Sequence, residues 1–455
     1  MKKILFTLLV SSFCFGQTFD KVTLLQSGSN DKRINIAVLG DGFTSAQQTN
    51  FVTAAQNSIN YLFTKSPYKE YKNYFNAYAI KVISTQTGVK HPGNATDVTE
   101  PSIPVSNPTN YLGTTFDYGK VHRCIYSSTT NKVAQVLSAN LPDYDITYIL
   151  GNSTEYGGCG GTYAFSSINS SSNEIVVHEL GHTFGKLADE YWFAGTGESP
   201  NKTQTSNPLT VKWKNWVGTN SVGVYPYTES PTWYRPHQNC EMRYLNSQFC
   251  SVCKEATIER IHSLVSPIDS YTPTNSYVSV GSSNVTFTVN EILPIPNTLV
   301  NTWKLNGVTL SSTSNSITIS PSQLNIGNNT LLFSVTDGTS LVKVNNHSSV
   351  HFANLSWTLN KSTLKPIREI DVIERRFGIY PNPASNEFYI KAKQNFGENI
   401  NVAIYDGSGK SLPVKFNIKD ETTLRVDISN IPSGTYTLAV TEKDQLIISQ
   451  RIVKD

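Results

Sequence analysis

Two patterns of hydrophobic positions divide the chain. Up to about residue 266, apolar runs of strand length alternate with segments whose apolar residues recur every three or four positions. The first pattern is typical of buried strands and the second of amphipathic helices. This part is therefore predicted to be α/β. The expected strands cover 34–39, 75–84 and 146–150, and the expected helices cover 44–64, 130–140 and 252–265.

Beyond Pro267 the helical spacing disappears, and short runs alternate between apolar and polar residues. Asn-Gly at 306–307 and Asp-Gly at 337–338 are turn signals between these runs. Short strands at this spacing, with an early Trp303, predict an immunoglobulin-like β-sandwich. The expected organisation is a leader at 1–16, an α/β domain at 17–266, a sandwich at 267–362, a linker at 363–376 and a small all-β domain at 377–455.

Composition narrows the functional classes. A chain of 455 residues exceeds one hydrophobic core, so several domains are expected. Lys and Arg number 37 against 34 Asp and Glu, with no basic stripe, which argues against a nucleic-acid partner. Charged residues make up only 16%, a composition that suits a secreted, strand-rich protein.

The N-terminus has the pattern of a secretory signal peptide. Lys2 and Lys3 precede an apolar run at 4–10, and cleavage is expected before Gln17. This run is too short to span a bilayer, and no later segment is long enough, so no transmembrane segment is predicted. Cys14 would suit a lipid anchor, but Phe13 is not the small residue that such a site needs.

The strongest chemical signal is the sequence HELGH at 178–182. On a helix, His178 and His182 lie one turn apart on the same face, so both imidazoles can reach one cation. Glu179 is then placed to act as a general base, as in zinc hydrolases. A capping box at 171–174 and a terminating Gly185 are expected to bound this helix. The alternative is an ordinary helix with two solvated or buried histidines.

Five cysteines remain after removal of the leader: Cys124, Cys159, Cys240, Cys250 and Cys253. An exported protein meets an oxidising environment, where disulfides are the default. We therefore expect disulfides that close the region 240–253, with one cysteine left unassigned. A metal or redox role for the C-x-x-C pair at 250–253 is disfavoured, because the chain has no second such pair.

Two sets of motifs resemble known families. The first set is LGDGF at 39–43, YGG at 156–158, HELGH at 178–182 with LADEY at 187–191, and NCEMR at 239–243 with FCSVC at 249–253. With these motifs, residues 20–265 resemble the IgA-peptidase family of secreted bacterial zinc metallopeptidases. The second set is YPNPA at 380–384, IYDGSGK at 404–410 and DISNIPSGTY at 427–436. With it, the last domain resembles the C-terminal sorting domain of the type IX secretion route.

The first resemblance implies a metzincin-like α/β zincin domain followed by two all-β domains. Metzincins place a methionine in a tight turn beneath the metal, and Met242 suits that role; the alternative is that Met242 only fills the core. Their third ligand lies six residues after the second histidine, where this chain has Ala188, which cannot bind zinc. Asp189 is the favoured replacement and Glu190 the other possibility. The strand expected at 162–167 would be the sheet edge that pairs with an extended substrate, or an ordinary hairpin strand.

The implied function is a zinc-dependent endopeptidase. His178, His182 and Asp189 would bind Zn²⁺, and Glu179 would be the general base. Tyr191, Tyr234 and Arg243 are possible oxyanion donors, and the sequence does not rank them. The partners would be a protein or peptide substrate and the type IX machinery, and the location would be the exterior of a Gram-negative bacterium. The alternative is a secreted glycan- or protein-binding protein whose zinc module is structural or inactive.

Overall fold

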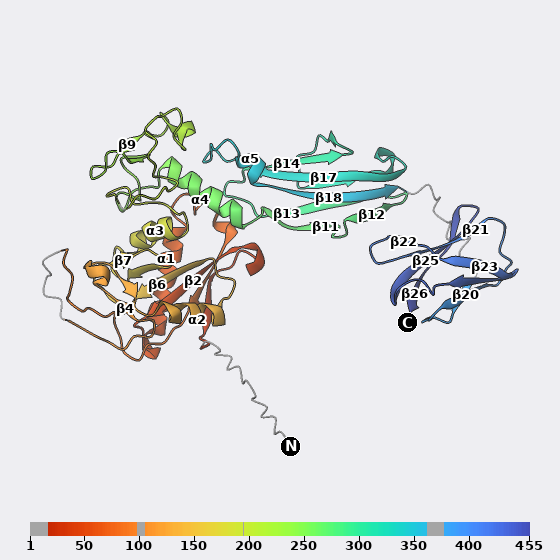
Figure 1. The fold of residues 1–455 in the computed structure, drawn as a ribbon, viewed down its shortest axis with the longest axis horizontal. Coiled ribbons are helices and arrows are strands. Elements are labelled where there is room, and N and C mark those ends of the chain that lie inside the picture. The colour runs from red at the N-terminus through yellow and green to blue at the C-terminus, as the bar shows by residue number, and fades with distance from the viewer. Residues whose placement is uncertain (1–16, 98–104, 194, 362–376) are drawn as a thin grey trace, which may run out of the picture. The chain divides into compact units, whose positions relative to one another are not determined.

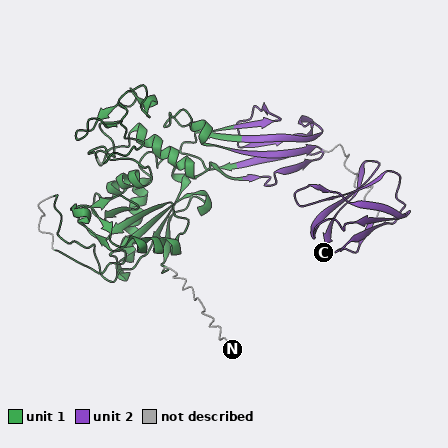
Figure 2. Ribbon diagram, in the orientation of Figure 1, with its two compact units in different colours: residues 1–270, 290–301, 334–353 green, residues 271–289, 302–333, 354–455 purple. Residues whose placement is uncertain are grey.

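The computed structural model describes residues 17–97, 105–193, 195–361 and 377–455. The predicted leader and linker lie outside the described residues. The chain forms two compact units, coloured separately in Figure 2. The first contains described residues up to 270 together with 290–301 and 334–353, and the second contains 271–289, 302–333 and described residues from 354 to 455.

The described residues of the first unit form a six-stranded sheet in the order β1-β3-β2-β6-β8-β7 (Figure 1). The four inner strands are parallel, and the outer strands β1 and β7 are antiparallel to their neighbours. The strands are β1 (Lys21–Leu25), β2 (Ile34–Asp41), β3 (Phe75–Ile80), β6 (Ile146–Gly151), β7 (Gly158–Cys159) and β8 (Ala164–Ser167).

Helices cover both faces of this sheet, because alternate residues of each central strand point to opposite sides. Ile34, Ile36 and Val38 of β2 belong to the core shared with three helices: α1 (Gln48–Leu62), α3 (Ser172–Thr183) and α4 (Ser251–Leu264). Ala37 and Leu39 belong to the core shared with α2 (Thr130–Asn140). A strand buried on both faces has a continuous apolar sequence, which is why the run at 34–39 predicted a strand correctly.

The remaining described elements of this unit are short. They include the pairs β4 (Thr114–Thr115) with β5 (Tyr126–Ser127) and β9 (Tyr225–Pro226) with β10 (Tyr234–Arg235), and the helix α5 (His347–Val350). The 3-10 helices are Asn30–Lys32, Ser45–Gln47, Lys72–Tyr74, Tyr118–Lys120 and Lys214–Trp216.

The buried carboxylate of Asp41, in the LGDGF motif, holds the segment at 112–114 in place. Asp41 accepts hydrogen bonds from the backbone amides of Leu112 and Thr114, each at 2.9 Å, and from the Thr114 hydroxyl at 2.7 Å. Gly42 has a φ of +74°, and a Cβ there would lie 2.3 Å from the carbonyl oxygen of Gly88. This motif therefore joins the end of β2 to the segment that leads towards the cleft described below.

A buried ion pair ties the segment that follows α1 to the start of α3. The Lys65 Nζ lies 2.6 Å from Glu174 Oε1, and both side chains are at most 10% exposed. Tyr61 also donates a hydrogen bond to this carboxylate. The predicted capping box is wrong: the N-cap, Ser171, makes no side-chain capping bond, because Glu174 points to Lys65 instead.

Replacing Lys65 with Met should lower the free energy of unfolding by roughly 3 kcal/mol, because it leaves a buried carboxylate without its cation. Chemical denaturation followed by circular dichroism measures this change. The double variant Lys65→Met with Glu174→Leu should recover most of the loss, since it removes both charges. Equal destabilisation of the single and double variants would show that the charge pair is not the cause.

Residues 268–361 supply two further sheets, with the orders β11-β13-β16 and β12-β18-β17-β14-β15. Trp303 and Trp357 are at most 1% exposed and stack with ring centroids 6.0 Å apart. The strands are β11 (Ile268–Thr272), β12 (Tyr277–Val280), β13 (Val285–Glu291), β14 (Leu299–Leu305), β15 (Val308–Thr309), β16 (Ser316–Ile319), β17 (Gly327–Asp337) and β18 (Phe352–Lys361), with a 3-10 helix at Pro321–Gln323.

Residues 377–455 form two four-stranded sheets around a common apolar core. One sheet has the order β19-β20-β24-β23 and the other β22-β21-β25-β26. Their bounds are β19 (Phe377–Tyr380), β20 (Glu387–Ala392), β21 (Ile400–Tyr405), β22 (Ser411–Leu412), β23 (Lys415–Asp420), β24 (Thr423–Asp427), β25 (Gly434–Glu442) and β26 (Gln445–Lys454).

Candidate metal centre

Helix α3 presents two histidines towards one point. Its apolar residues Ile175, Val176 and Leu180 are at most 4% exposed, which fixes the rotation of the helix. His178 and His182 then lie one turn apart, with their Nε2 atoms 3.2 Å from each other. The predicted helix and its spacing therefore bring both imidazoles together.

After α3 the chain turns back and adds a carboxylate. The amide of Leu187 donates to the carbonyl of Gly181 at 3.0 Å, and Lys186 adopts a φ of +56°. Gly185 lies in this turn, where a Cβ would be 2.9 Å from the Gly181 carbonyl oxygen. The turn places Asp189 Oδ1 3.1 Å from His178 Nε2 and 3.2 Å from His182 Nε2.

Glu190, the other possible third ligand, points away from the histidines. It is fully buried, and its Oε1 accepts a hydrogen bond from Asn201 at 2.9 Å. The same oxygen lies 3.5 Å from Cys253 Sγ. The structure therefore brings Asp189, and not Glu190, to the two imidazoles.

The outer nitrogens of both rings are held by backbone carbonyls. His178 Nδ1 lies 3.0 Å from the carbonyl oxygen of Glu241, and His182 Nδ1 lies 2.8 Å from that of Leu187. A carbonyl oxygen only accepts, so each Nδ1 carries a proton, and in the neutral ring each Nε2 keeps a lone pair. This is the arrangement that orients metal-binding imidazoles.

Nε2 of both histidines and Oδ1 of Asp189 thus lie within 3.2 Å of one another, and their lone pairs repel unless a proton or a metal ion lies among them. Ligand atoms on a tetrahedral zinc ion, at 2.0–2.1 Å from it, are about 3.3 Å apart. Burial opposes the charged forms, but the contacts with Asp189 raise the pKa of His178 to about 9 and hold the pKa of Asp189 below its usual range. These residues fit a divalent metal ion.

Glu179 lies beside this centre and is only 8% exposed. Its Oε2 is buried and has no hydrogen-bond partner among the described residues. Burial raises the pKa of Glu179 above its ordinary value. A Cβ at Gly160 would lie 2.5 Å from Oε2, so the glycine leaves room for this carboxylate.

A cleft of about 620 Å³ opens over Glu179 and the metal-binding atoms. One side is formed by the edge strand β7 and the segment at 121–124. Of the two possibilities for 162–167, the edge strand is wrong and the hairpin strand is right: β8 lies between β6 and β7, pairs antiparallel with β7, and leaves β7 as the outer strand. The run Tyr156–Gly161 has too few apolar residues to predict a strand locally, and it pairs only through its contact with β8.

Two of the three possible oxyanion donors line this cleft, Tyr191 and Arg243. The Tyr191 ring lies 6.3 Å from that of His178, centroid to centroid. The Arg243 guanidinium donates to the carbonyl of Gln238 at 2.7 Å. Tyr234 lies in β10 and is not among the described residues that line the cleft.

Met242 lies in a tight turn directly behind the helix. The amides of Arg243 and Tyr244 both donate to the carbonyl of Cys240, at 2.8 and 2.9 Å. A Cβ on Gly181 would lie 2.4 Å from Met242 Sδ, so this glycine admits the thioether against α3. The Met242 carbonyl accepts from the amide of Glu190 at 2.7 Å, which links the turn to the loop that carries Asp189.

The expectation of disulfides within 240–253 is wrong. The disulfide in the described residues joins Cys124 to Cys159, and Cys240, Cys250 and Cys253 are free thiols. Cys124 and Cys159 both line the cleft, and β7 ends at Cys159. This disulfide forms because β7 lies next to the segment at 121–124. The sequence around either cysteine does not predict that contact.

Replacing both Cys124 and Cys159 with Ser should lower the free energy of unfolding by about 3–4 kcal/mol, because it reopens a loop that spans 35 residues. Denaturation without reductant measures the loss. Adding reductant to the unaltered chain should reproduce it, whereas reductant should leave the double variant unchanged. A response of the variant to reductant would point to another disulfide.

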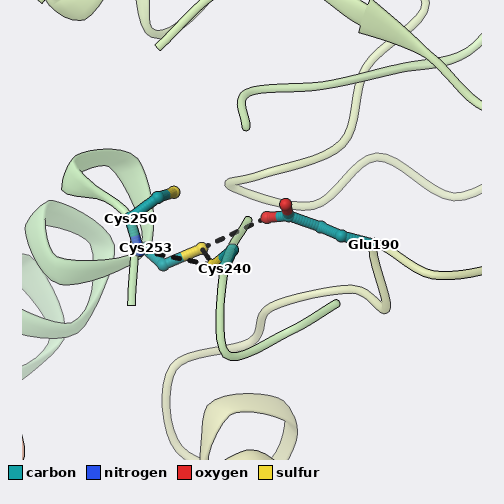
Figure 3. Close-up of side chains that lie close together, drawn as sticks. All are labelled: Glu190, Cys240, Cys250 and Cys253. Carbon is teal, nitrogen blue, oxygen red and sulfur yellow. Dashed lines mark hydrogen bonds between the residues drawn. The ribbon is translucent and has the colours of Figure 1, made fainter. Parts of the chain in front are cut away.

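Two further groups of potential metal ligands occur, one that includes the C-x-x-C pair whose metal role the sequence analysis disfavoured and one that it did not identify. Within the described residues, Glu190, Cys240, Cys250 and Cys253 converge in the core (Figure 3), and His91, Asp117 and His122 converge near the cleft. The C-x-x-C spacing at 250–253 was a signal for the first group. The second group, His91, Asp117 and His122, comes from positions far apart in the sequence, so no short motif predicts it.

Comparisons with known proteins agree with the motifs. Residues 22–231 match the family described as IgA Peptidase M64, and residues 378–455 match the secretion system C-terminal sorting domain. No curated protein matches the chain. None of the helices in the described ranges combines the length and apolar composition that a membrane span needs.

The solved structures with detectable similarity have low TM-scores against this chain. They include the Lin-41 filamin domain (10% identity, 18% of this chain, 94% of that chain, TM-score 0.16). They also include Bacteroides ovatus SGBP-B in complex with a mixed-linkage heptasaccharide (12% identity, 39% and 42% covered, TM-score 0.17) and murine CEACAM1b (13%, 41% and 96%, TM-score 0.17). These scores are too low to support an argument. The two family matches carry more weight: residues 22–231 are similar to the IgA Peptidase M64 family, and the sorting domain at 378–455 indicates secretion through the outer membrane of a Gram-negative bacterium.

Proposed function

We propose that this protein is a zinc-dependent endopeptidase, with His178, His182 and Asp189 as the metal ligands and Glu179 as the general base. One observation carries the proposal: Nε2 of both histidines and Oδ1 of Asp189 converge, while each Nδ1 is fixed by a backbone carbonyl. Two imidazoles and a carboxylate leave a tetrahedral ion with an open position, which is the pattern of catalytic rather than structural zinc sites.

When bound, zinc would supply a Lewis acid for the scissile carbonyl and would lower the pKa of water at its open position. Glu179 would take the proton from the attacking water and pass it to the leaving amine. Its Oε2 has no competing hydrogen-bond donor among the described residues, so it is available for this transfer. Tyr191 and Arg243, which line the cleft, would donate to the developing oxyanion.

The edge strand β7 is proposed to align the substrate. It is paired on one side with β8. On its other side the amide of Gly158 already donates to the carbonyl of Arg123 at 2.9 Å, so a substrate would pair beyond Gly158. An extended peptide could add there through backbone hydrogen bonds, next to Gly160 and Glu179. Recognition through the backbone of an extended chain suits cleavage within a polypeptide. A metzincin-like arrangement, supported by the turn at Gly185 and by Met242 behind α3, is part of the proposal.

Cleavage of casein or gelatin by the leader-free chain tests this function. We expect cleavage that a chelator abolishes and added Zn²⁺ restores. A library of peptides blocked at both termini would separate an endopeptidase from an exopeptidase and would define the preferred sequence. Absence of cleavage by zinc-saturated protein would contradict the proposal and favour a binding function.

A further inference from the structure

Four side chains from three separate segments meet in the core behind the candidate metal centre (Figure 3). Glu190 follows Asp189 in the returning loop, Cys240 begins the turn that holds Met242, and the Cys250–Cys253 pair lies at the start of α4. Glu190, Cys240 and Cys253 are fully buried, and Cys250 is 6% exposed. One ligand atom from each residue lies within 4.8 Å of those of the other three.

The distances within this cluster are those of ligands around one metal ion. Cys240 Sγ lies 3.7 Å from Cys253 Sγ, far beyond the roughly 2.05 Å of a disulfide. Cys253 Sγ lies 3.5 Å from Glu190 Oε1. A tetrahedral zinc ion, with sulfur at about 2.3 Å and oxygen at about 2.0 Å, places two sulfurs about 3.8 Å apart and sulfur and oxygen about 3.5 Å apart.

The surroundings leave one carboxylate oxygen of this cluster without a partner. Glu190 Oε2 is buried and has no hydrogen-bond partner among the described residues. The backbone amide of Cys250 donates to Cys240 Sγ at 3.3 Å, which holds this sulfur against the start of α4. Three cysteines also cannot all pair among themselves as disulfides.

We propose that Glu190, Cys240, Cys250 and Cys253 bind a structural zinc ion. Four protein ligands close the coordination sphere and leave no open position for catalysis. The ion would link the loop of Asp189 and the turn of Met242 to the first turn of α4. Glu241, whose carbonyl orients His178, directly follows Cys240. This second ion would hold the parts that position the catalytic ligands, and it does not depend on the chain being a peptidase.

Counting thiols separates this site from a disulfide without any substitution. The chain is purified without reductant, unfolded with chelator and alkylated, and then analysed by mass spectrometry. We expect Cys240, Cys250 and Cys253 all to be alkylated, with Cys124 and Cys159 protected by their bond. A disulfide among the three would leave a single alkylated thiol and would overturn the proposal.

A second experiment loads the protein with Co²⁺ in place of Zn²⁺, because the absorption spectrum of Co²⁺ reports which atoms bind it. Co²⁺ bound by thiolates produces intense near-ultraviolet charge-transfer absorption, which the His178–His182–Asp189 centre cannot give, since it has no sulfur ligand. We expect this absorption in the chain loaded with Co²⁺, and expect it to persist in His178→Ala with His182→Ala. Absence of the absorption in folded, cobalt-loaded protein would contradict a thiolate site.

Metal analysis then assigns the ligands. In the His178→Ala, His182→Ala background, adding Cys250→Ser should lower bound zinc by about one equivalent per chain. The matched control is the double variant Cys124→Ser with Cys159→Ser, which removes the disulfide pair and should leave the zinc content unchanged. If Cys250→Ser prevents folding, Glu190→Gln replaces it, with the cobalt absorption band expected to shift. Unchanged zinc in a folded Cys250→Ser chain would refute the site, even if the protein cleaves peptides.

Discussion

Replacing Glu179 with Gln should lower kcat/KM for peptide cleavage by about 10²–10⁴-fold, while the bound metal stays at the level of the unaltered chain. Gln keeps the shape of the side chain but cannot accept the proton of the attacking water. Glu179 contacts the cleft and is not among the three converging metal-binding atoms, so metal retention is expected. Steady-state cleavage of a fluorogenic peptide, with metal analysis of the same preparation, measures both quantities.

Glu198→Gln is the matched control, because Glu198 is an exposed glutamate that pairs with Lys212 away from the cleft. It should leave kcat/KM within the error of the measurement. The pH profile adds a second readout: the acidic limb of the unaltered chain requires ionised Glu179, so this limb should disappear in the residual activity of the Gln variant. Full activity in Glu179→Gln would remove Glu179 from the mechanism.

Replacing Asp189 with Ala should weaken the affinity for zinc by at least about 100-fold and abolish cleavage at limiting metal. Loss of a supporting outer residue alone typically costs about 10–100-fold, and Asp189 provides one of the three converging atoms. Removing it also leaves two imidazole nitrogens facing each other at 3.2 Å without a carboxylate. Competition with a chromophoric chelator measures the affinity directly.

Asp189→Asn separates charge from shape. It keeps an oxygen in place but removes the negative charge, so its zinc affinity should fall between those of the unaltered chain and Asp189→Ala. Ala188→Gly is a control for the backbone of the same loop and should change the affinity little. Unaltered zinc affinity in Asp189→Ala would return the third ligand to Glu190 or to another residue.

The sequence was sufficient for the elements whose signal is local. The apolar run at 34–39, the helical spacing at 130–140 and the HELGH motif each predicted an element found at that place. The start of α3 was placed correctly but for the wrong reason. Glu174 makes its contact with Lys65, which is 109 residues away, so no local pattern could show that it leaves the cap.

Long-range pairing explains the other differences. The edge of the sheet is β7, a strand of two residues that exists only through its pairing with β8. The disulfide between Cys124 and Cys159 depends on the same placement. The choice between Asp189 and Glu190 depends on the turn around Lys186, whose positive φ sets which of the two adjacent side chains faces α3. Comparison with the metzincin spacing left Asp189 and Glu190 as possible third ligands. The path of the backbone decides which of the two side chains faces the histidines.

The most direct test is anomalous diffraction at the zinc absorption edge from crystals of the zinc-loaded chain. The account predicts one strong peak bonded to His178 Nε2, His182 Nε2 and Asp189 Oδ1, with Glu179 beside its open side. A second peak is predicted among Glu190 and the three free cysteines. Zinc bound elsewhere, with the two histidines and Asp189 left unligated in a fully loaded protein, would contradict the account.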